Sequence, residues 1–82
     1  MEKSQACLYT IYDRIAEESS PPFLARTDGV AIRHYLAAMQ NKDITPDDFW
    51  LYKIGGYDTA DMRLQALTQP MRVLIKNKEV EA

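Results

Sequence analysis

The sequence has almost none of the residues that staple a small secreted domain or hold a metal ion. It contains one cysteine, Cys7, and one histidine, His34, among 82 residues. A single thiol cannot close a disulfide within the chain, and no Cys-x-x-Cys or His-x-x-x-His spacing occurs, which excludes a structural zinc site. The start of the sequence also lacks an apolar run, so we expect a protein of a reducing cytoplasm that needs no metal or cofactor.

Long apolar runs and net positive charge are absent as well. The longest apolar stretch, 49–54, is interrupted by Lys53 and is far shorter than the roughly 20 residues that cross a bilayer, so we expect no membrane contact. The formal net charge is -2 and the isoelectric point is about 5.2. The whole molecule therefore has no long-range attraction for phosphate backbones, and any nucleic-acid binding must depend on a local cluster of cations.

No linker, repeat or low-complexity tract divides the chain, and its three glycines and four prolines lie at expected turns. Hydrophobic residues make up 46% and charged residues 27%, a balance typical of chains that fold. A chain of this length buries only about 60% of the surface that it exposes when unfolded, so its core is thin. We expect one domain over residues 1–82, with a charged tail that frays from about residue 76.

The first part of the chain favours strands. Residues 6–15 are rich in aromatic and β-branched side chains that alternate between the two sides of a pleat. One side carries Leu8, Thr10 and Tyr12, and the other carries Cys7, Tyr9 and Ile11. Residues 16–22 are acidic and end in Ser-Ser-Pro-Pro, which predicts a loop, and residues 23–25 are expected to pair briefly beside the first strand.

One amphipathic helix is predicted over residues 28–40, and Thr27 or Asp28 is suited to cap its amino end. Its apolar positions recur at helical spacing and are Ala31, Ile32, Tyr35, Leu36, Ala38 and Met39. The other face is polar, so the helix is expected to lie on a sheet. A further helical turn is expected after Thr45, where a proline and two carboxylates suit a first turn.

A second strongly β-prone run covers residues 49–57, and the Gly-Gly pair near its end predicts a bulge or the end of the strand. Turn-forming residues at 58–61 predict a hairpin whose second arm covers 62–67. Pro70 is expected to end that arm. Residues 71–75 are then a last short candidate strand.

This order predicts an α+β domain in which a small antiparallel or mixed β-sheet has one main α-helix packed across it. The second face of such a sheet is only partly covered. The strands carry aromatic side chains, which include Tyr9, Tyr12, Trp50 and Tyr52. Because the core is thin, a homodimer that shields this face is a reasonable hypothesis.

No pattern of residues indicates catalysis. His34 lies in the middle of the predicted helix, and Cys7 has no nearby base or helix terminus to activate its thiol. The acidic pairs at 17–18 and 47–48 are explained by loop solvation and helix capping, and the Gly-Gly pair lacks the spacing of a phosphate-binding loop. We therefore expect a protein that is not an enzyme, has no catalytic, metal or cofactor residues, and acts by binding.

The basic and aromatic residues are the most informative candidates for a binding site. Arginines combined with stacking aromatic rings hold single-stranded nucleic acid without reading its sequence. The candidate residues are Arg26, Arg33, Arg63, Arg72, Trp50, Tyr52 and Tyr57. The composition favours a plainer alternative, in which these charges only solvate the surface and balance the twelve carboxylates.

Three pieces of the chain resemble a family of phage proteins. They read YTIYD at 9–13, PFLARTDGVAIR at 22–33 and LYKIGGYD at 51–58. In this order and at this chain length they are similar to the small nonstructural protein of gokushovirus-type microviruses (Microviridae), the tailless bacteriophages with single-stranded DNA genomes. After Asp58 the chain departs from that pattern, because the residues TADM at 59–62 stand where the family carries a more acidic turn with glycine.

The resemblance implies a nonstructural, DNA-binding protein that acts in the host cytoplasm, where it steers viral DNA replication toward single-stranded genome synthesis and packaging. It implies no active-site residue. We therefore expect the chain to bind single-stranded DNA through its arginine and aromatic residues. The alternative is a protein-interaction module that docks on a viral replication protein, a capsid precursor or a host factor without contacting DNA, and the acidic isoelectric point favours it.

Overall fold

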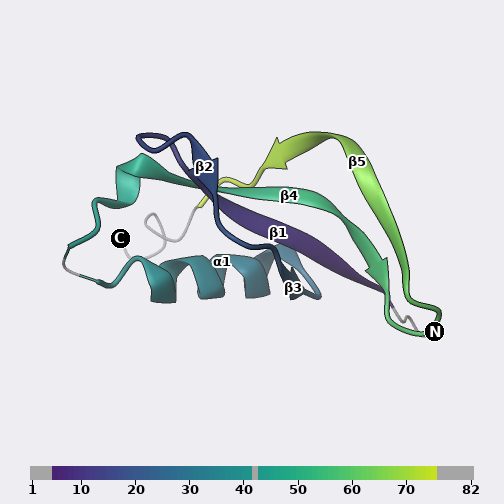
Figure 1. The fold of residues 1–82 in the computed structure, drawn as a ribbon. Coiled ribbons are helices and arrows are strands. Elements are labelled where there is room, and N and C mark those ends of the chain that lie inside the picture. Colours follow the sequence, from purple (N-terminus) through teal and green to yellow (C-terminus); the bar gives the residue numbers. More distant parts are fainter. Residues whose placement is uncertain (1–4, 42, 76–82) are drawn as a thin grey trace.

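The computed structural model describes residues 5–41 and 43–75, so the tail predicted to fray from about residue 76 lies outside the described part (Figure 1). The elements follow one another as β1 (Gln5–Asp13), β2 (Glu18–Ser19), β3 (Phe23–Ala25), α1 (Asp28–Ala38), the 3-10 turn η1 (Pro46–Asp48), β4 (Phe49–Asp58) and β5 (Arg63–Arg72). The predicted strands at 6–15, 23–25 and 49–57 are confirmed, as are the helix and the short helical turn. The predicted loop at 16–22 contains the short strand β2.

All strand pairs are antiparallel, and the sheet has the order β2-β1-β4-β5, with β3 also paired to β1. β1 and β4 pair along their whole lengths, from Gln5 opposite Asp58 to Asp13 opposite Phe49. β3 pairs with the first half of β1 and β2 with its end, so these two short strands form one interrupted edge. The opposite edge is β5, which is ten residues long.

β5 leaves β4 in the middle of its course and then returns to it. Ala66 lies opposite Gly55 and Met71 lies opposite Lys53, so residues 67–70 of β5 face only Ile54 of β4. The extra residues make β5 arch away from its neighbour, which Figure 1 shows above β4. The predicted Gly-Gly bulge is confirmed at this point by the shift in register.

The prediction that Pro70 ends a hairpin arm and that a separate strand follows is wrong, because β5 runs through this proline without a break. Proline cannot donate a backbone hydrogen bond, and this penalty holds only where the strand is paired. Pro70 lies on an edge strand, inside the arch where no residue of β4 is directly opposite.

The predicted α+β fold, a sheet with one main helix packed across it, is also wrong. Strands make up 49% of the described residues and helices 20%, and the fold is a curled antiparallel half-barrel with a single short helix. α1 has eleven residues and is about 16 Å long, whereas the ten residues of β4 or β5 span about 33 Å. The helix therefore covers only the part of the sheet near β1 and β3 (Figure 1).

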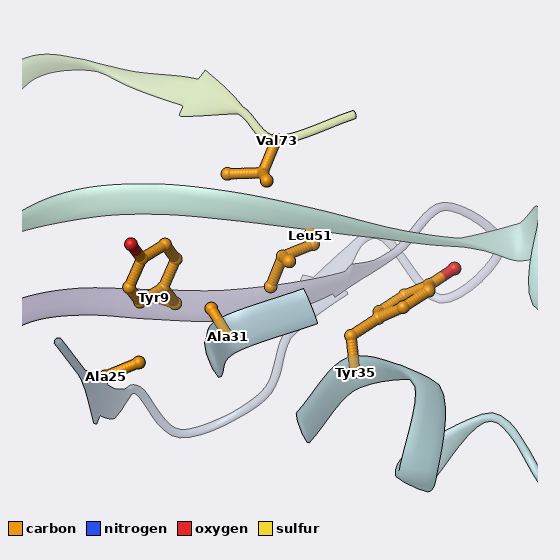
Figure 2. Close-up of a cluster of buried hydrophobic side chains, with 6 residues drawn as sticks. All are labelled: Tyr9, Ala25, Ala31, Tyr35, Leu51 and Val73. Atoms are coloured by element: carbon orange, nitrogen blue, oxygen red, sulfur yellow. The ribbon is translucent and has the colours of Figure 1, made fainter. Parts of the chain in front are cut away.

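The core lies between this part of the sheet and α1. Its largest fully buried side chains are Tyr9 of β1 and Leu51 of β4. Around them pack Ala25, Ala31, Tyr35 and Val73 (Figure 2). Burial of a side chain such as Leu51 contributes about 1.5–3 kcal/mol to the free energy of unfolding. The other large apolar positions predicted on the helix are only partly buried against this cluster, as expected for a thin core.

Two tyrosine hydroxyls attach the two ends of α1 to the sheet. At the amino end, the Tyr9 hydroxyl donates a hydrogen bond of 2.6 Å to Asp28 Oδ1, and Lys53 Nζ lies 3.4 Å from the same oxygen. At the other end, the Tyr35 hydroxyl donates to the Phe49 carbonyl oxygen at 2.8 Å. Thr27 caps the helix, because its side-chain oxygen accepts a hydrogen bond from a backbone N–H of the first turn.

Candidate nucleic-acid interface

The two faces of the sheet carry different side chains. Strand alternation turns Tyr9 and Leu51 toward α1, where both are buried (Figure 2). Tyr12 and Trp50 lie opposite one another in the β1–β4 register and point to the other face, and Tyr52 follows on the same side of β4. The predicted division of side chains between the two faces of β1 and β4 is thus confirmed, and the face away from the helix is aromatic.

Two arginines join the aromatic rings on this face. The guanidinium carbon of Arg72 lies 4.0 Å from the centroid of the Trp50 ring, and that of Arg14 lies 5.1 Å from it. The Tyr52 ring is 6.5 Å from Trp50 and meets the Tyr12 ring edge-on at 6.3 Å. We call these five residues the Trp50 cluster. Each cation–π contact contributes about 0.5–1 kcal/mol at an exposed site, and every ring keeps part of its surface open to solvent.

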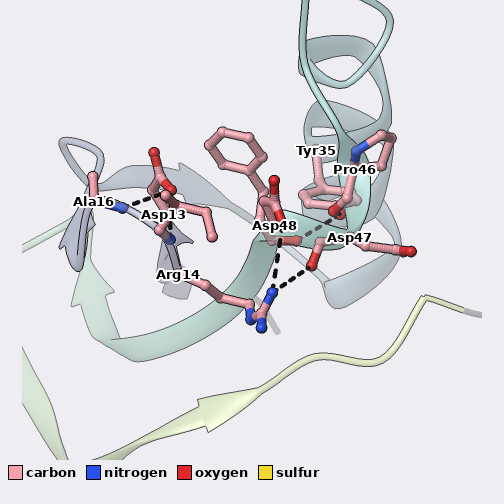
Figure 3. Close-up of polar contacts among 9 residues, drawn as sticks. Asp13, Arg14, Ala16, Tyr35, Pro46, Asp47 and Asp48 are labelled. Atoms are coloured by element: carbon pink, nitrogen blue, oxygen red, sulfur yellow. Dashed lines mark hydrogen bonds and ion pairs between the residues drawn. The ribbon is translucent and has the colours of Figure 1, made fainter.

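The two arginines differ in how they are held. Arg14 follows β1, and its Nη1 lies 3.5 Å from Asp48 Oδ1 and 3.5 Å from the Asp47 carbonyl oxygen (Figure 3). Arg72 is exposed on β5, and within the described residues it has no carboxylate partner. The Arg72 guanidinium is therefore available to a negatively charged ligand, and its contact with Trp50 keeps it beside the rings.

A groove lies next to the Trp50 cluster, on the same face of the sheet. It has a volume of about 700 Å³ and is bounded on one side by the segment after β2 and on the other by the arch of β5. Its lining residues are Thr10, Tyr12, Ser19, Ser20, Pro22, Tyr52, Ile54, Gln69 and Pro70. Two rings are thus shared by the cluster and the groove, so a flexible ligand that contacts one also reaches the other.

Three of the residues predicted from the sequence come together here, namely Trp50, Tyr52 and Arg72. The remaining four do not join them. Arg26 donates a hydrogen bond of 2.9 Å to the Gln5 carbonyl oxygen at the far end of β1, and Arg63 pairs with Asp61 at 3.5 Å beside the β4–β5 turn. Arg33 is exposed on α1, and Tyr57 lies opposite Ala6 and Leu64 toward that same far end.

Sequence reasoning missed Arg14 and the position of Tyr12 within the site. Tyr12 was expected on the correct face of its strand, but only the pairing of β1 with β4 brings it opposite Trp50. Arg14 reaches Trp50 because the chain turns immediately after β1 and the side chain folds back. The one feature of the sequence that could have indicated the role of Arg14 is its position two residues after Tyr12, at the end of a predicted strand.

His34 packs against an aromatic ring, and the hydroxyls of Tyr9 and Tyr35 have raised pKa values. The His34 ring stacks on Phe23 at 3.9 Å between centroids, and Phe23 in turn stacks on Tyr9 at 5.9 Å. Burial and the hydrogen bond to Asp28 raise the pKa of the Tyr9 hydroxyl, and burial raises the pKa of the Tyr35 hydroxyl. Both hydroxyls therefore stay protonated near neutral pH.

Residues 5–41 and 43–75 contain no group of three or more His, Cys, Asp or Glu residues arranged to hold a metal ion. The same residues contain no helix with the length and apolar character needed to cross a membrane.

The fold and this surface define a small, mostly β protein whose curled sheet carries an exposed arginine and aromatic cluster on its helix-free face. The chain matches the family model described as Phage ORF5 protein over residues 6–80, and it belongs to this family of phage proteins. A search of curated proteins and a search of solved structures found no match.

Proposed function

We propose that this phage protein is a non-enzymatic binder of single-stranded DNA, encoded by a gokushovirus-type microvirus, and that it acts in genome replication or packaging in the host cytoplasm. The observation that carries the proposal is the Trp50 cluster, where two guanidinium groups lie within about 5 Å of an indole ring beside two more aromatic rings. Rings that stack on bases and cations that contact phosphates are the two elements of sequence-tolerant single-strand binding.

The energetics favour an exchange of partners at Trp50. A DNA base stacked on an aromatic side chain contributes about 1–3 kcal/mol, more than the contact with Arg72 that it would replace. The displaced guanidinium then pairs with the neighbouring phosphate, where a charge-assisted hydrogen bond is stronger. Stacking and local pairing of this kind do not require a positively charged molecule, which agrees with the net charge of -2.

The proposal is tested by fluorescence anisotropy with a labelled single-stranded oligonucleotide at about 50 and 200 mM salt, with a duplex as competitor. One arginine–phosphate contact, made by Arg72, predicts a loss of affinity of about threefold between these salt concentrations. Trp50→Ala should weaken binding about tenfold or more. Arg72→Ala should weaken it and flatten the salt dependence, whereas the exposed helix arginine gives the matched control Arg33→Ala, which should change neither.

Trp50 is the chain's single tryptophan, so its intrinsic fluorescence reports directly on the site. Titration with unlabelled single-stranded DNA should quench this emission. Absence of binding at low salt, or equal affinity of the protein and its Trp50→Ala variant, would refute the proposal.

The edge strand favours a second candidate function. Every residue of β5 is exposed, including Leu64 at 66% and Met71 at 54%, and the outer edge of the strand has no partner among the described residues. We propose that β5 is a protein-contact surface that accepts an added strand, either from a viral or host replication protein or from a second copy of this chain. Leu64→Lys should abolish binding of the protein partner and leave DNA affinity unchanged. If this variant loses both protein binding and DNA binding, β5 is not a protein-contact surface separate from the DNA site.

A further inference from the structure

We infer that the groove beside the Trp50 cluster holds one unpaired nucleobase of the bound strand, with the Gln69 carboxamide hydrogen-bonded to the edge of that base. The inference rests on the proposed single-strand binding and adds to it a specific subsite. The cluster alone accounts for stacking on a surface, whereas the open groove adds two walls between which a base can lie with its polar edge contacted.

The lining of the groove suits a flat aromatic ligand with one polar edge. Its volume of about 700 Å³ lies in the range of small-ligand sites. Tyr52 and Ile54 of β4 contribute ring and aliphatic surface, and Pro22 and Pro70 contribute apolar surface from the two opposite walls. Such surfaces contact the two faces of a base and leave its edge to the few polar groups present.

The polar groups of the lining fall into two sets. Thr10 and Ser20 are already engaged, because the Thr10 hydroxyl donates to the Ser20 carbonyl oxygen at 2.7 Å and Ser20 Oγ accepts from the Ile11 N–H at 3.1 Å. Within the described part of the chain, the Gln69 carboxamide and the hydroxyls of Ser19, Tyr12 and Tyr52 have no hydrogen-bond partner. Of these four groups available to a ligand, only the Gln69 carboxamide offers a donor and an acceptor on separate neighbouring atoms.

Gln69 has the chemistry of an edge-reading residue. A carboxamide presents a donor and an acceptor side by side, and every DNA base carries an adjacent donor and acceptor on its Watson–Crick edge. Gln69 can therefore form two parallel hydrogen bonds with any of the four bases after a flip of the amide. The groove consequently selects unpaired bases as a class, because a base within a duplex has its Watson–Crick edge occupied.

The groove depends on the arch of β5. If β5 paired with β4 without interruption, residues 67–70 would lie in the ladder against Ile54 and its neighbours, and the space would close. Bulges of this kind are common next to binding sites, because they redirect side chains out of the regular pleat. The arch also places Gln69 three residues before Arg72, so the same strand contributes the base contact and the phosphate contact.

The test compares two glutamines of one strand. Gln69→Leu keeps the size of the side chain and removes both hydrogen bonds, and Gln65→Leu is the matched control, since Gln65 is exposed on β5 opposite Gly56 and outside this groove. Both variants are measured against a single-stranded oligonucleotide of about ten thymidines, and their thermal unfolding is recorded to confirm that each is folded.

We expect Gln69→Leu to weaken binding about threefold to tenfold with an unchanged salt dependence, and Gln65→Leu to bind like the unaltered protein. The same measurement on an oligonucleotide of abasic sugar phosphates should show no difference between Gln69→Leu and the unaltered protein, because the base contact is then missing in both.

The outcomes separate this inference from the proposed function. If the unaltered protein binds thymidine oligonucleotides and Gln69→Leu binds equally well, the groove subsite is wrong while single-strand binding stands. If the effect of Gln69→Leu persists on the abasic strand, Gln69 contacts the backbone and the subsite is likewise wrong. If the unaltered protein does not bind DNA, both proposals fail. A proline-rich peptide is the alternative ligand of the groove. If such a peptide displaces the base from the groove but leaves the DNA-induced quenching of Trp50 fluorescence unchanged, the groove is a peptide site and the inference is overturned.

Discussion

At the scale of single residues, hydroxyl groups connect elements that are far apart in sequence. The bond from Tyr9 to Asp28 joins residues 19 apart, and the bond from Tyr35 to Phe49 joins residues 14 apart. Both tyrosines also belong to the buried core, so each contributes apolar contact and a hydrogen bond. In a protein with a thin core, such residues carry a large share of the free energy of unfolding.

We predict that Tyr9→Phe lowers the free energy of unfolding at pH 7 by about 1 kcal/mol, the net contribution of one hydrogen bond. The pKa of Tyr9 is raised in the folded protein, so only the unfolded chain ionises this group from about pH 10 upward. The stability that depends on neutral Tyr9 is therefore complete below about pH 10 and falls as the pH rises further. In urea denaturation between pH 7 and 11, the free energy of unfolding should fall less steeply with pH for Tyr9→Phe than for the unaltered protein.

Tyr57→Phe is the control for the loss at pH 7, because the Tyr57 hydroxyl has no hydrogen-bond partner within the described residues. If Tyr57→Phe lowers the free energy of unfolding as much as Tyr9→Phe does, the hydrogen bond from Tyr9 to Asp28 does not have the importance assigned to it.

Met62 has an unfavourable backbone conformation, with φ at 67°, in the turn between β4 and β5. Residues other than glycine pay about 1–2 kcal/mol in this region. Met62→Gly should therefore raise the free energy of unfolding by up to about 1 kcal/mol, since glycine also gains entropy in the unfolded chain. Ala60→Gly in the same turn should give no gain, and thermal or urea denaturation measures both. A destabilised Met62→Gly would show that the side chain, exposed at 75%, makes contacts that offset the strain.

At the scale of elements, the pairing of β4 with β5 decides where the groove lies. The two strands approach closely at Gly55, where an added Cβ would lie 2.5 Å from the Gln65 carbonyl oxygen, and they separate immediately beyond it. The close approach and the arch therefore occur side by side on the same strand pair. The pair of Gly55 with Ala66 is therefore the last close backbone contact before β5 separates from β4.

We predict that Gly55→Ala lowers the free energy of unfolding by about 1–3 kcal/mol, because the methyl group has no space against the backbone of β5. Gly56→Ala is the matched control, since a Cβ there would meet its nearest atom at 3.8 Å, an ordinary contact distance. Urea denaturation of the two variants measures the difference. Equal stability of both would show that β5 shifts at little cost and is only loosely attached.

At the scale of the whole molecule, the exposed apolar side chains gather on the edge formed by β5. The exposed large hydrophobic residues in and next to this strand are Met62, Leu64, Leu67, Met71 and Leu74. A long edge strand usually carries charges that discourage pairing, but β5 has no lysine and has charged residues only at its two ends. The β5 edge therefore exposes apolar side chains and unpaired backbone groups to water, whether or not the protein binds DNA.

We predict that two copies of the chain associate through their β5 edges, in an antiparallel arrangement with twofold symmetry. Sedimentation velocity from about 1 to 100 µM should show a concentration-dependent rise in mass, and the unfolding temperature should rise over the same range. Leu64→Lys should remove both effects. A sedimentation coefficient that stays constant at the monomer value over this range would refute the dimer.

Much of the local structure could be predicted because it depends on neighbouring residues. The alternation at 6–15, the apolar spacing and cap of the helix and the Gly-Gly bulge all depend on short-range geometry, and each prediction was confirmed. The errors concern β5, where a rule against proline in strands was applied to an edge that arches away from its partner. Underestimating β5 also led to the wrong fold class, because the helix was given the dominant role.

The sequence by itself determined the helix, the faces of β1 and β4 and a likeness to phage proteins, because periodicity and turn chemistry are local and the family pattern lies in short pieces of sequence. Only the tertiary structure decided which arginines meet which rings. The register of β1 on β4 and the return of β5 bring Arg14 and Arg72 to Trp50, while Arg26 and Arg63 lie toward the far end of the sheet. Register results from contacts between residues distant in sequence, so no local pattern records it.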